Sequence, residues 1–537
     1  MPTSAALNRS AAFAVFVLLA VVHTWPLATN PAHLSRNDNG DALLNTWAIA
    51  WVAHQLPRDP AHLFDANIFY PDRYALGYSE AMVVQGALAA PVIAAGGSPV
   101  LAYNVVLLAG FALTGWAFWL LVVRWTGSVP AGYVAGCLAA FNAHVLLRLP
   151  HLQAQHVEFV ALALFALDAL LASSRLRHAV LLGAAFALQA LTSVYLLVFA
   201  AWMLIFAAGA RAAEWLRRDR VRSAALLGVA AVTALVVLAP YLIAYGHVHQ
   251  QAGFDRTVED AQTYAGSWVD YLATGGRFHY WLWSAPFVAR AMSNNFPGVA
   301  ALALLALACA WPETRRDHRL RMCLAAGAGC AAISMLPNAP FYPMLHPYVP
   351  FFHAVRVEAH LGQIVLLMIA VAAGFGMAGL VRRVPGGRAR PAVVAAALVL
   401  VNVEALRAPL GYEPFSHIPR IYGVLAREPR AVVVEMPFFA PQVFHSNAPY
   451  MLDSTRHWQP MLNGYSGFRP EWYDAMFERL QHFPDRESLA ALADRGVTHV
   501  VVHRDRYAED DLEAVKHLDG LHLVADEENI QIYRLRP

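Results

Sequence analysis

The first 409 residues alternate long apolar stretches with shorter polar connections. A helix needs about 17–25 predominantly apolar residues to cross a bilayer. Stretches that approach this length lie at 11–28, 100–123, 130–148, 157–173, 179–209, 223–243, 296–311, 320–336, 360–380 and 391–408. The pattern predicts a polytopic bundle of transmembrane helices. The first stretch follows Arg9 without a convincing small-residue cleavage site, so we expect a signal anchor.

The distribution of arginine predicts the direction in which these stretches cross, because cytoplasmic loops carry an excess of basic residues. Arginine clusters lie at 124, 175–177, 211–222, 315–321 and 382–390. If all of these clusters are cytoplasmic, residues 179–209 must form two short crossings with a turn near 192–195. The apolar run 80–97 must then be a helix that lies on the membrane surface or is re-entrant. This predicts about 11 crossings, with the N-terminus inside and the C-terminus outside. Short and re-entrant helices are tolerated where they line a cavity, so we expect a cavity on the outer side.

The pattern changes after residue 410. Strand-like apolar runs alternate with helical spacing, which is typical of a small α/β domain. The strand-like runs are 431–434, 497–502, 521–524 and 530–533, and the helical ones are 471–481 and 487–495. We therefore predict two domains, a transmembrane domain over 1–409 and an extracytoplasmic α/β domain over 410–537.

Composition supports a membrane protein and excludes several function classes. The chain is 58% hydrophobic and 14% charged, against roughly 45–50% and 25% in soluble domains. Lys516 is the one lysine among 39 basic residues, so the sequence contains no phosphate-binding G-K-[ST] loop. A net charge of +2 gives no basic footprint for nucleic acid.

The first outer loop carries two candidate aspartates, Asp38 and Asp41. The spacing from Asp41 to Leu56 predicts a helix with Trp47 and Trp51 on one face. Such a helix would lie in the headgroup layer with its tryptophans towards the lipid. The two aspartates would then sit at its start, beside the expected cavity. Alternatively, Asp41 caps the helix and Asp38 belongs to the preceding turn.

The second outer loop concentrates polar side chains between two apolar stretches, at His151, Gln153, His156 and Glu158. Polar groups at that depth are costly unless they are paired or functional. We expect them to hydrogen-bond to a polar ligand or to each other. A metal held by two histidines and the glutamate is an alternative, although a helical zinc site has histidines at i and i+4 rather than i and i+5.

Arg356 opens the apolar stretch that follows the fourth outer loop. A single outward arginine can extend towards lipid headgroups. It can equally bind a phosphate through two parallel hydrogen bonds.

Several segments resemble a known family. The order of a first span, an acidic outer loop with an interfacial helix, and then Asp65-Ala66-Asn67-Ile68-Phe69-Tyr70-Pro71 resembles membrane proteins of the GT-C glycosyltransferase superfamily. His151–Gln153, Leu191–Tyr195 and Ser454–Phe468 look like one bacterial branch of it. The likeness extends over nearly the whole chain. It implies a GT-C-type bundle in a bacterial inner membrane, with the N-terminus cytoplasmic and the C-terminal domain periplasmic or extracellular.

The resemblance also implies an activity. Members of the superfamily use an aspartate of the first outer loop as catalytic base and take sugar from a polyprenyl phosphate or diphosphate carrier. That role would fall on Asp41 or Asp38 here. The implied reaction is inverting transfer of a hexose or pentose to a glycan, lipid or protein acceptor of the cell envelope. No cofactor is implied, and a divalent metal is not indicated.

The residues implied for the donor phosphate and sugar are Arg356, His151, Gln153, His156, Glu158 and Tyr195. The branch commonly has a second arginine four residues after Arg356. This chain has His360 at that position.

The exported segment from Ser454 to Phe468 is dense in groups that bind sugars. Aromatic faces pack against sugar C–H surfaces, while amides and guanidinium groups reach hydroxyls. We predict that it contacts the acceptor through Arg456, His457, Trp458, Asn463 and Tyr465. Alternatively, these residues cap the α/β domain against the membrane domain.

Two other functions fit the same composition. One is a lipid or polysaccharide transporter without catalysis, and the other is a non-catalytic relative that only binds glycan. A transporter would favour inverted repeats and charged pairs at the bilayer midplane, and the sequence contains neither. The expected partners are therefore a lipid-linked sugar, its acceptor and membrane lipid, and not nucleic acid.

Overall fold

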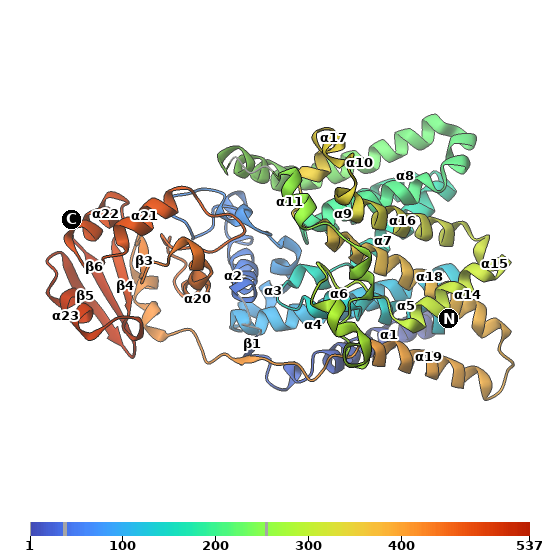
Figure 1. Ribbon diagram of the computed structural model, residues 1–537, viewed down its shortest axis with the longest axis horizontal. Helices are drawn as coiled ribbons and strands as arrows, with labels where there is room; N and C mark the ends of the chain where they lie inside the picture. Colours follow the sequence, from blue (N-terminus) through green and yellow to red (C-terminus); the bar gives the residue numbers. More distant parts are fainter. Residues whose placement is uncertain (1, 36–39, 253–255, 537) are drawn as a thin grey trace. The chain divides into compact units, whose positions relative to one another are not determined.

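The computed structural model describes residues 2–35, 40–252 and 256–536 and is mainly helical (Figure 1). The chain divides into two compact units. Unit 1 contains 1–30, 105–241 and 255–411, and unit 2 contains 31–104, 242–254 and 412–537. Each unit is therefore built from segments that are far apart in the sequence.

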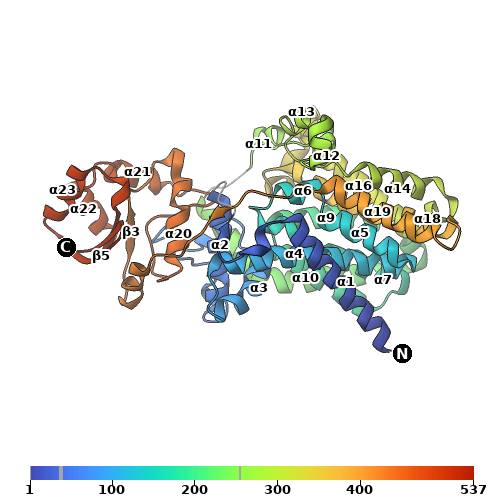
Figure 2. The ribbon, with the colours of Figure 1, turned by 90° about the horizontal axis from the view of Figure 1, so that it is seen from below.

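Unit 1 is a bundle of apolar helices. Its longer helices are α1 (Pro2–His23), α4 (Pro99–Thr126), α5 (Val129–Ala140), α7 (Glu158–Ser173), α8 (Leu176–Ala190), α9 (Val194–Gly209), α10 (Ala212–Ala252), α14 (Val299–Ala310), α16 (His318–Met335), α18 (Gly362–Arg383) and α19 (Ala389–Ala405). Helices α4 and α10 each continue into unit 2 at one end. Nearly every residue of α18 up to Gly379 is buried, and α18 contacts α5, α14 and α16 (Figure 2). A helix that is apolar all round forms the core of such a bundle.

Short helices connect the longer ones in unit 1. They are α6 (Ala143–Leu147), α11 (Val258–Thr263), α12 (Arg277–His279), α13 (Ala285–Val288), α15 (Pro312–Arg315) and α17 (Tyr342–Leu345).

The predicted multi-pass character is confirmed. Five helical segments among the described residues are long and apolar enough to cross a membrane: Pro99–Thr126, Val129–Leu147, Arg220–Gln251, His318–Asn338 and Glu358–Arg383. Shorter apolar helices include α8 and α9, which are separated at the position where the sequence predicts a turn. The Ser193 side chain caps the start of α9 by accepting hydrogen bonds from the backbone N–H groups of Tyr195 and Leu196. The number of 11 crossings and their orientation stay predictions.

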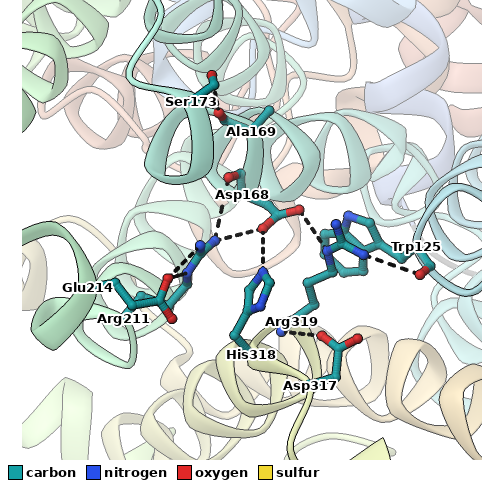
Figure 3. Close-up of polar contacts among 9 residues, drawn as sticks. All are labelled: Trp125, Asp168, Ala169, Ser173, Arg211, Glu214, Asp317, His318 and Arg319. Atoms are coloured by element: carbon teal, nitrogen blue, oxygen red, sulfur yellow. Dashed lines mark hydrogen bonds and ion pairs between the residues drawn. The ribbon is translucent and has the colours of Figure 1, made fainter. Parts of the chain in front are cut away.

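A buried ionic network joins three helices of unit 1 and the segment before α10 (Figure 3). Asp168 of α7 accepts hydrogen bonds from Arg211 at 2.7 Å, from His318 at 3.1 Å and from Arg319 at 2.9 Å. Arg319 also donates to the carbonyl oxygen of Trp125, near the end of α4. The two arginines belong to clusters that the sequence assigns to the cytoplasmic side, so the network holds that predicted end of the bundle together.

Unit 2 contains α2 (Gly40–Gln55) and α3 (Val83–Ala94), which contact each other. At 1.5 Å per residue α3 is about 18 Å long, which is too short to cross a bilayer of about 30 Å. This length fits the prediction of a surface or re-entrant helix in the run 80–97.

The orientation predicted for the tryptophans of α2 is wrong. Trp47 and Trp51 are buried within unit 2 instead of facing lipid. The indole N–H of Trp47 donates to Asn67 Oδ1 at 3.1 Å, and that of Trp51 donates to the carbonyl oxygen of Leu63 at 2.8 Å. The loop after α2, together with α3 and α20 (Ala448–Ser454), covers the helix on several sides.

The C-terminal part of unit 2 contains a four-stranded sheet with the order β3-β4-β6-β5. Its strands are β3 (Val433–Met436), β4 (His499–His503), β5 (Leu521–Glu527) and β6 (Ile530–Leu535). Strands β3 and β4 are parallel, and the other two pairings are antiparallel. A separate two-stranded pair joins β1 (Leu34–Ser35) to β2 (Glu413–Pro414). The small sheet predicted from the sequence is confirmed.

Helices α21 (Trp472–Leu480), α22 (Arg486–Asp494) and α23 (Glu509–His517) accompany this sheet. The sequence predicted α21 and α22 but missed α23 and α20. Helix α20 has 7 residues, too few for a 3.6-residue period to be visible. Helix α23 buries a single residue, Val515.

Candidate functional site

Asp41 lies in the first turn of α2, which begins at Gly40. Its Oδ1 accepts a hydrogen bond from the hydroxyl of Tyr465 at 2.6 Å, although the two residues are 424 positions apart in the sequence. The other predicted base, Asp38, lies outside the described residues. The structure therefore brings together one candidate base and one of the residues predicted for the acceptor.

The surroundings of Tyr465 hold its hydroxyl in this position. Its backbone N–H donates to the sulfur of Met451, and its ring packs edge-on against Phe444 at 5.1 Å. A Cβ on Gly40 would come within 3.1 Å of the tyrosine ring, so the glycine permits this close approach. Burial and the neighbouring Asp41 carboxylate raise the pKa of Tyr465, so the hydroxyl keeps its proton and acts as a donor.

This arrangement suits a carboxylate that accepts a proton. The positive end of the helix macrodipole favours an anion in the first turn of α2. The tyrosine orients one carboxylate oxygen without neutralising the charge, because its hydroxyl is uncharged. Asp41 is also only partly buried. A partly accessible, oriented carboxylate can act as a general base on an acceptor hydroxyl.

The five residues predicted for the acceptor separate into three places within unit 2. Tyr465 donates a hydrogen bond to Asp41, while Arg456 and Trp458 line a groove. His457 and Asn463 are buried. The segment therefore contains both exposed and core positions.

The two buried side chains contact the chain itself. Asn463 bonds to both the N–H and the carbonyl of Glu435 in β3, at 2.7 and 2.9 Å. His457 accepts a hydrogen bond from the N–H of Gln459 at 2.9 Å, and burial lowers its pKa to about 3, so the ring is neutral at neutral pH. These contacts match the alternative in which part of the segment stabilises the small domain.

In unit 1 the structure brings together Arg356 and Tyr195, both predicted for the donor. The backbone N–H of Arg356 donates to the hydroxyl of Tyr195 at 3.3 Å. The guanidinium of Arg356 donates to the hydroxyl of Tyr264 and lies 4.6 Å from the centroid of that ring. Arg356 is exposed. Its guanidinium is thus oriented by an aromatic ring yet remains accessible.

Two further arginines complete a group that the sequence analysis missed. The Arg148 guanidinium donates to Nε2 of His360, whose ring lies 6.3 Å from that of Tyr195. Arg256 is half-buried and interacts electrostatically with Tyr195 and Arg356. We call Arg148, Arg256 and Arg356 the arginine cluster. Arg148 supplies a guanidinium beside His360, the position where the resembling branch has its second arginine.

One signal in the sequence could have revealed these residues. The predicted outer connections are poor in arginine, and both Arg148 and Arg256 lie in them. An arginine on the side where arginine is rare needs a specific reason, and anion binding is one.

The polar loop 148–156 and its flank do not form one site. His156 and Glu158 pair at 3.1 Å in the interior of unit 1, and His156 also contacts the carbonyl oxygen of Val106 on α4. His151 instead lies near Arg148; burial and that arginine lower its pKa to about 3. Gln153 has a buried Oε1 without a hydrogen-bond partner among the described residues.

A metal site is not assembled from these groups. Within 2–35, 40–252 and 256–536, no three His, Cys, Asp or Glu side chains form a group that could hold a metal ion. The chemistry available to the arginine cluster is instead that of guanidinium groups, which match phosphate oxygens through paired hydrogen bonds.

No protein-family model and no curated protein matches the sequence. Among solved structures, the arabinofuranosyltransferase AftD from mycobacteria aligns with 98% of this chain, with a TM-score of 0.61 and 14% identity. The chain therefore shares the fold of this arabinofuranosyltransferase over nearly its whole length. A variant of AftD aligns with a TM-score of 0.59 at the same identity. At this identity the likeness concerns the fold.

The chain spans 40% of the length of the AftD chain. ArnT from Cupriavidus metallidurans, bound to undecaprenyl phosphate, aligns with a TM-score of 0.48 and 13% identity, over 99% of this chain and 98% of ArnT. The alignment with AftD confirms, for the fold, the resemblance identified in the sequence.

Proposed function

We propose that this chain is an integral membrane glycosyltransferase that transfers a sugar from a polyprenyl-phosphate carrier to a cell-envelope acceptor on the outer side of a bacterial inner membrane. The observation that carries the proposal is the hydrogen bond that the Tyr465 hydroxyl donates to Oδ1 of Asp41, at the start of α2. It provides an oriented carboxylate in the loop where the resemblance implies the base. The GT-C fold supports the same assignment.

In the proposed reaction Asp41 removes the proton from an acceptor hydroxyl while the acceptor oxygen attacks the anomeric carbon of the donor sugar. The bond between that carbon and the carrier phosphate breaks, and its electron pair stays on the phosphate oxygen. Attack from the face opposite to the phosphate inverts the configuration. Tyr465 orients the carboxylate throughout, so we classify it as a positioning residue.

We propose that the arginine cluster binds the carrier phosphate. Guanidinium groups stabilise the charge that develops on the departing phosphate. Tyr195, His151 and Gln153 would contribute neutral hydrogen bonds at the same place. The buried pair of His156 and Glu158 would support the surrounding helices, and we assign no step to a metal.

Turnover by the purified full-length protein tests the proposal. It should transfer sugar from a polyprenyl-phospho-sugar to cell-envelope acceptors, and Asp41→Asn should slow transfer about 10²–10⁴-fold. Asp510→Asn is a matched control, because Asp510 is an exposed carboxylate on α23. Movement of carrier that is unaffected by Asp41→Asn would favour the transporter. Glycan binding without turnover by the unaltered protein would favour the non-catalytic relative.

The orientation of the chain has its own test. Reporter fusions after Arg222 and at the C-terminal end should report cytoplasm and periplasm respectively. Identical results from both fusions would contradict the proposed topology, whatever the activity of the protein.

A further inference from the structure

A groove of about 1430 Å³ lies within unit 2, between α2, α3 and the segments 415–418 and 455–458. One of its walls is aliphatic. It is formed by Ala50 and Ala53 of α2 and by Ala87, Ala90 and Ala94 of α3. Small apolar side chains leave a smooth surface that offers no hydrogen bonds.

The lining of the groove also contains cations. Arg58 and Arg456 line it, and both are exposed. The guanidinium of Arg456 has no partner among the described residues, while Arg58 donates to the carbonyl oxygen of His54 at 2.6 Å. None of the described lining residues carries a carboxylate or a carboxamide. The groove therefore offers two positive charges without a negative one.

A tryptophan stands beside these arginines. Trp458 has a φ of 57°, in the left-handed region that side chains other than glycine rarely adopt. Its indole stacks on His54, with ring centroids 4.3 Å apart and an interplanar angle of 25°. Burial and the charge of Arg58 lower the pKa of His54 to about 4, so this imidazole is neutral at neutral pH. The result is a rigid aromatic platform next to the two guanidinium groups.

We propose that this groove binds an anionic membrane phospholipid, with the headgroup phosphate between Arg58 and Arg456 and the apolar part of the lipid along α3. Charge complementarity carries the proposal, because one lining combines two cations with an aliphatic wall. Helix α3 also exposes the side chain of Leu88. Tryptophan suits the boundary between these regions, since one part of its ring system is apolar and its N–H is polar.

Two other occupants fit less well. A neutral glycan would contact Trp458 and the hydroxyl groups of the lining, but it would leave Arg58 and Arg456 without a counter-charge. The sugar carrier must place its phosphate at the reacting centre. His54 lies 13 positions after Asp41 on α2, about 20 Å away at 1.5 Å per residue. The proposed lipid is therefore not a substrate of the proposed reaction, and this inference goes beyond that function.

Lipid binding by the full-length protein in a nonionic detergent tests the inference. Native mass spectrometry would measure adducts with dioleoyl phosphatidylglycerol and, separately, with zwitterionic dioleoyl phosphatidylcholine. The double variant Arg58→Gln/Arg456→Gln should bind the anionic lipid about 30-fold more weakly, because each arginine near an anionic headgroup contributes a factor of about five. Binding of the zwitterionic lipid should change little.

Arg486→Gln, an exposed arginine on α22 outside the groove, is the matched control and should bind both lipids as the unaltered protein does. Ala94→Asp adds a negative charge to the aliphatic wall at an exposed position and should weaken only the anionic lipid. Equal binding of phosphatidylglycerol by all variants would overturn the inference. Two other results would also overturn it. One is Arg456-dependent binding of a neutral oligosaccharide, and the other is displacement of the phospholipid by polyprenyl phosphate at equal concentration. Because this assay measures no turnover, its failure leaves the proposed glycosyl transfer standing.

Discussion

Two carboxylates, Asp41 in unit 2 and Asp168 in unit 1, show how differently the fold uses the same functional group. Asp168 is buried and surrounded by Arg211, Arg319 and His318. Asp41 is partly exposed, and its Oδ1 accepts a hydrogen bond from the neutral hydroxyl of Tyr465. Cations around a buried carboxylate compensate its charge. A neutral donor orients the carboxylate and leaves it able to accept a proton.

The difference follows from where each residue lies. Asp168 meets arginines from two separate clusters, so its charge joins α7 to α16 and to the segment before α10. A charge taken out of water needs such partners, because its desolvation is costly. Asp41 lies in the first turn of α2 and is only partly buried, so its desolvation is less costly.

The largest expected effect is on catalysis. Asp41→Asn should lower kcat about 10²–10⁴-fold, the usual contribution of a general base, and should leave the melting temperature nearly unchanged. Initial rates with a polyprenyl-phospho-sugar and thermal unfolding in detergent measure the two quantities. A variant with normal turnover would remove Asp41 from the mechanism.

Asp168→Asn should have the opposite effect, lowering stability without changing turnover. Removing this charge leaves the Arg211 side chain, which is 3% exposed, without its buried counter-charge, and breaking a buried pair costs about 3–5 kcal/mol. We expect less folded protein and a lower free energy of unfolding, but normal turnover per folded molecule. A variant that is stable yet inactive would contradict a purely structural role for Asp168.

Tyr465→Phe tests whether the tyrosine positions Asp41 or binds the acceptor. A hydrogen bond to a charged group contributes about 1.5–3 kcal/mol, so loss of the hydroxyl should lower kcat by about 10- to 100-fold. The KM for the acceptor should change little, and Phe keeps the ring packed against Phe444. An increase in KM at constant kcat would restore the acceptor role predicted from the sequence.

The smallest expected effect is on stability, and it distinguishes the two arginines that pair with Asp168. The Arg319 side chain is 31% exposed, so water screens its ion pair, and Arg319→Gln should cost only about 1 kcal/mol of unfolding free energy. Arg211→Gln should cost clearly more, because the Arg211 side chain is almost completely buried. Denaturant unfolding of both variants in one detergent measures the difference. Equal losses would mean that burial does not set the strength of these contacts.

The sequence by itself was sufficient for features that depend on local patterns. Apolar length and arginine distribution predicted a multi-pass bundle, and the period from Asp41 to Leu56 predicted α2 within one residue at either end. The break between α8 and α9 and the four strands of the C-terminal sheet were predicted in the same way. Such features follow from the spacing of neighbouring residues, because helices and strands place side chains at fixed periods.

Only the tertiary structure decided which distant side chains meet. The contact between Asp41 and Tyr465, and that between Arg148 and His360, each join segments more than 200 residues apart, and no periodicity in either segment specifies the other. The tryptophans of α2 show the same limit. Their spacing predicted an apolar face, but a protein segment covers that face instead of lipid, since lipid and a packed interior are equally apolar.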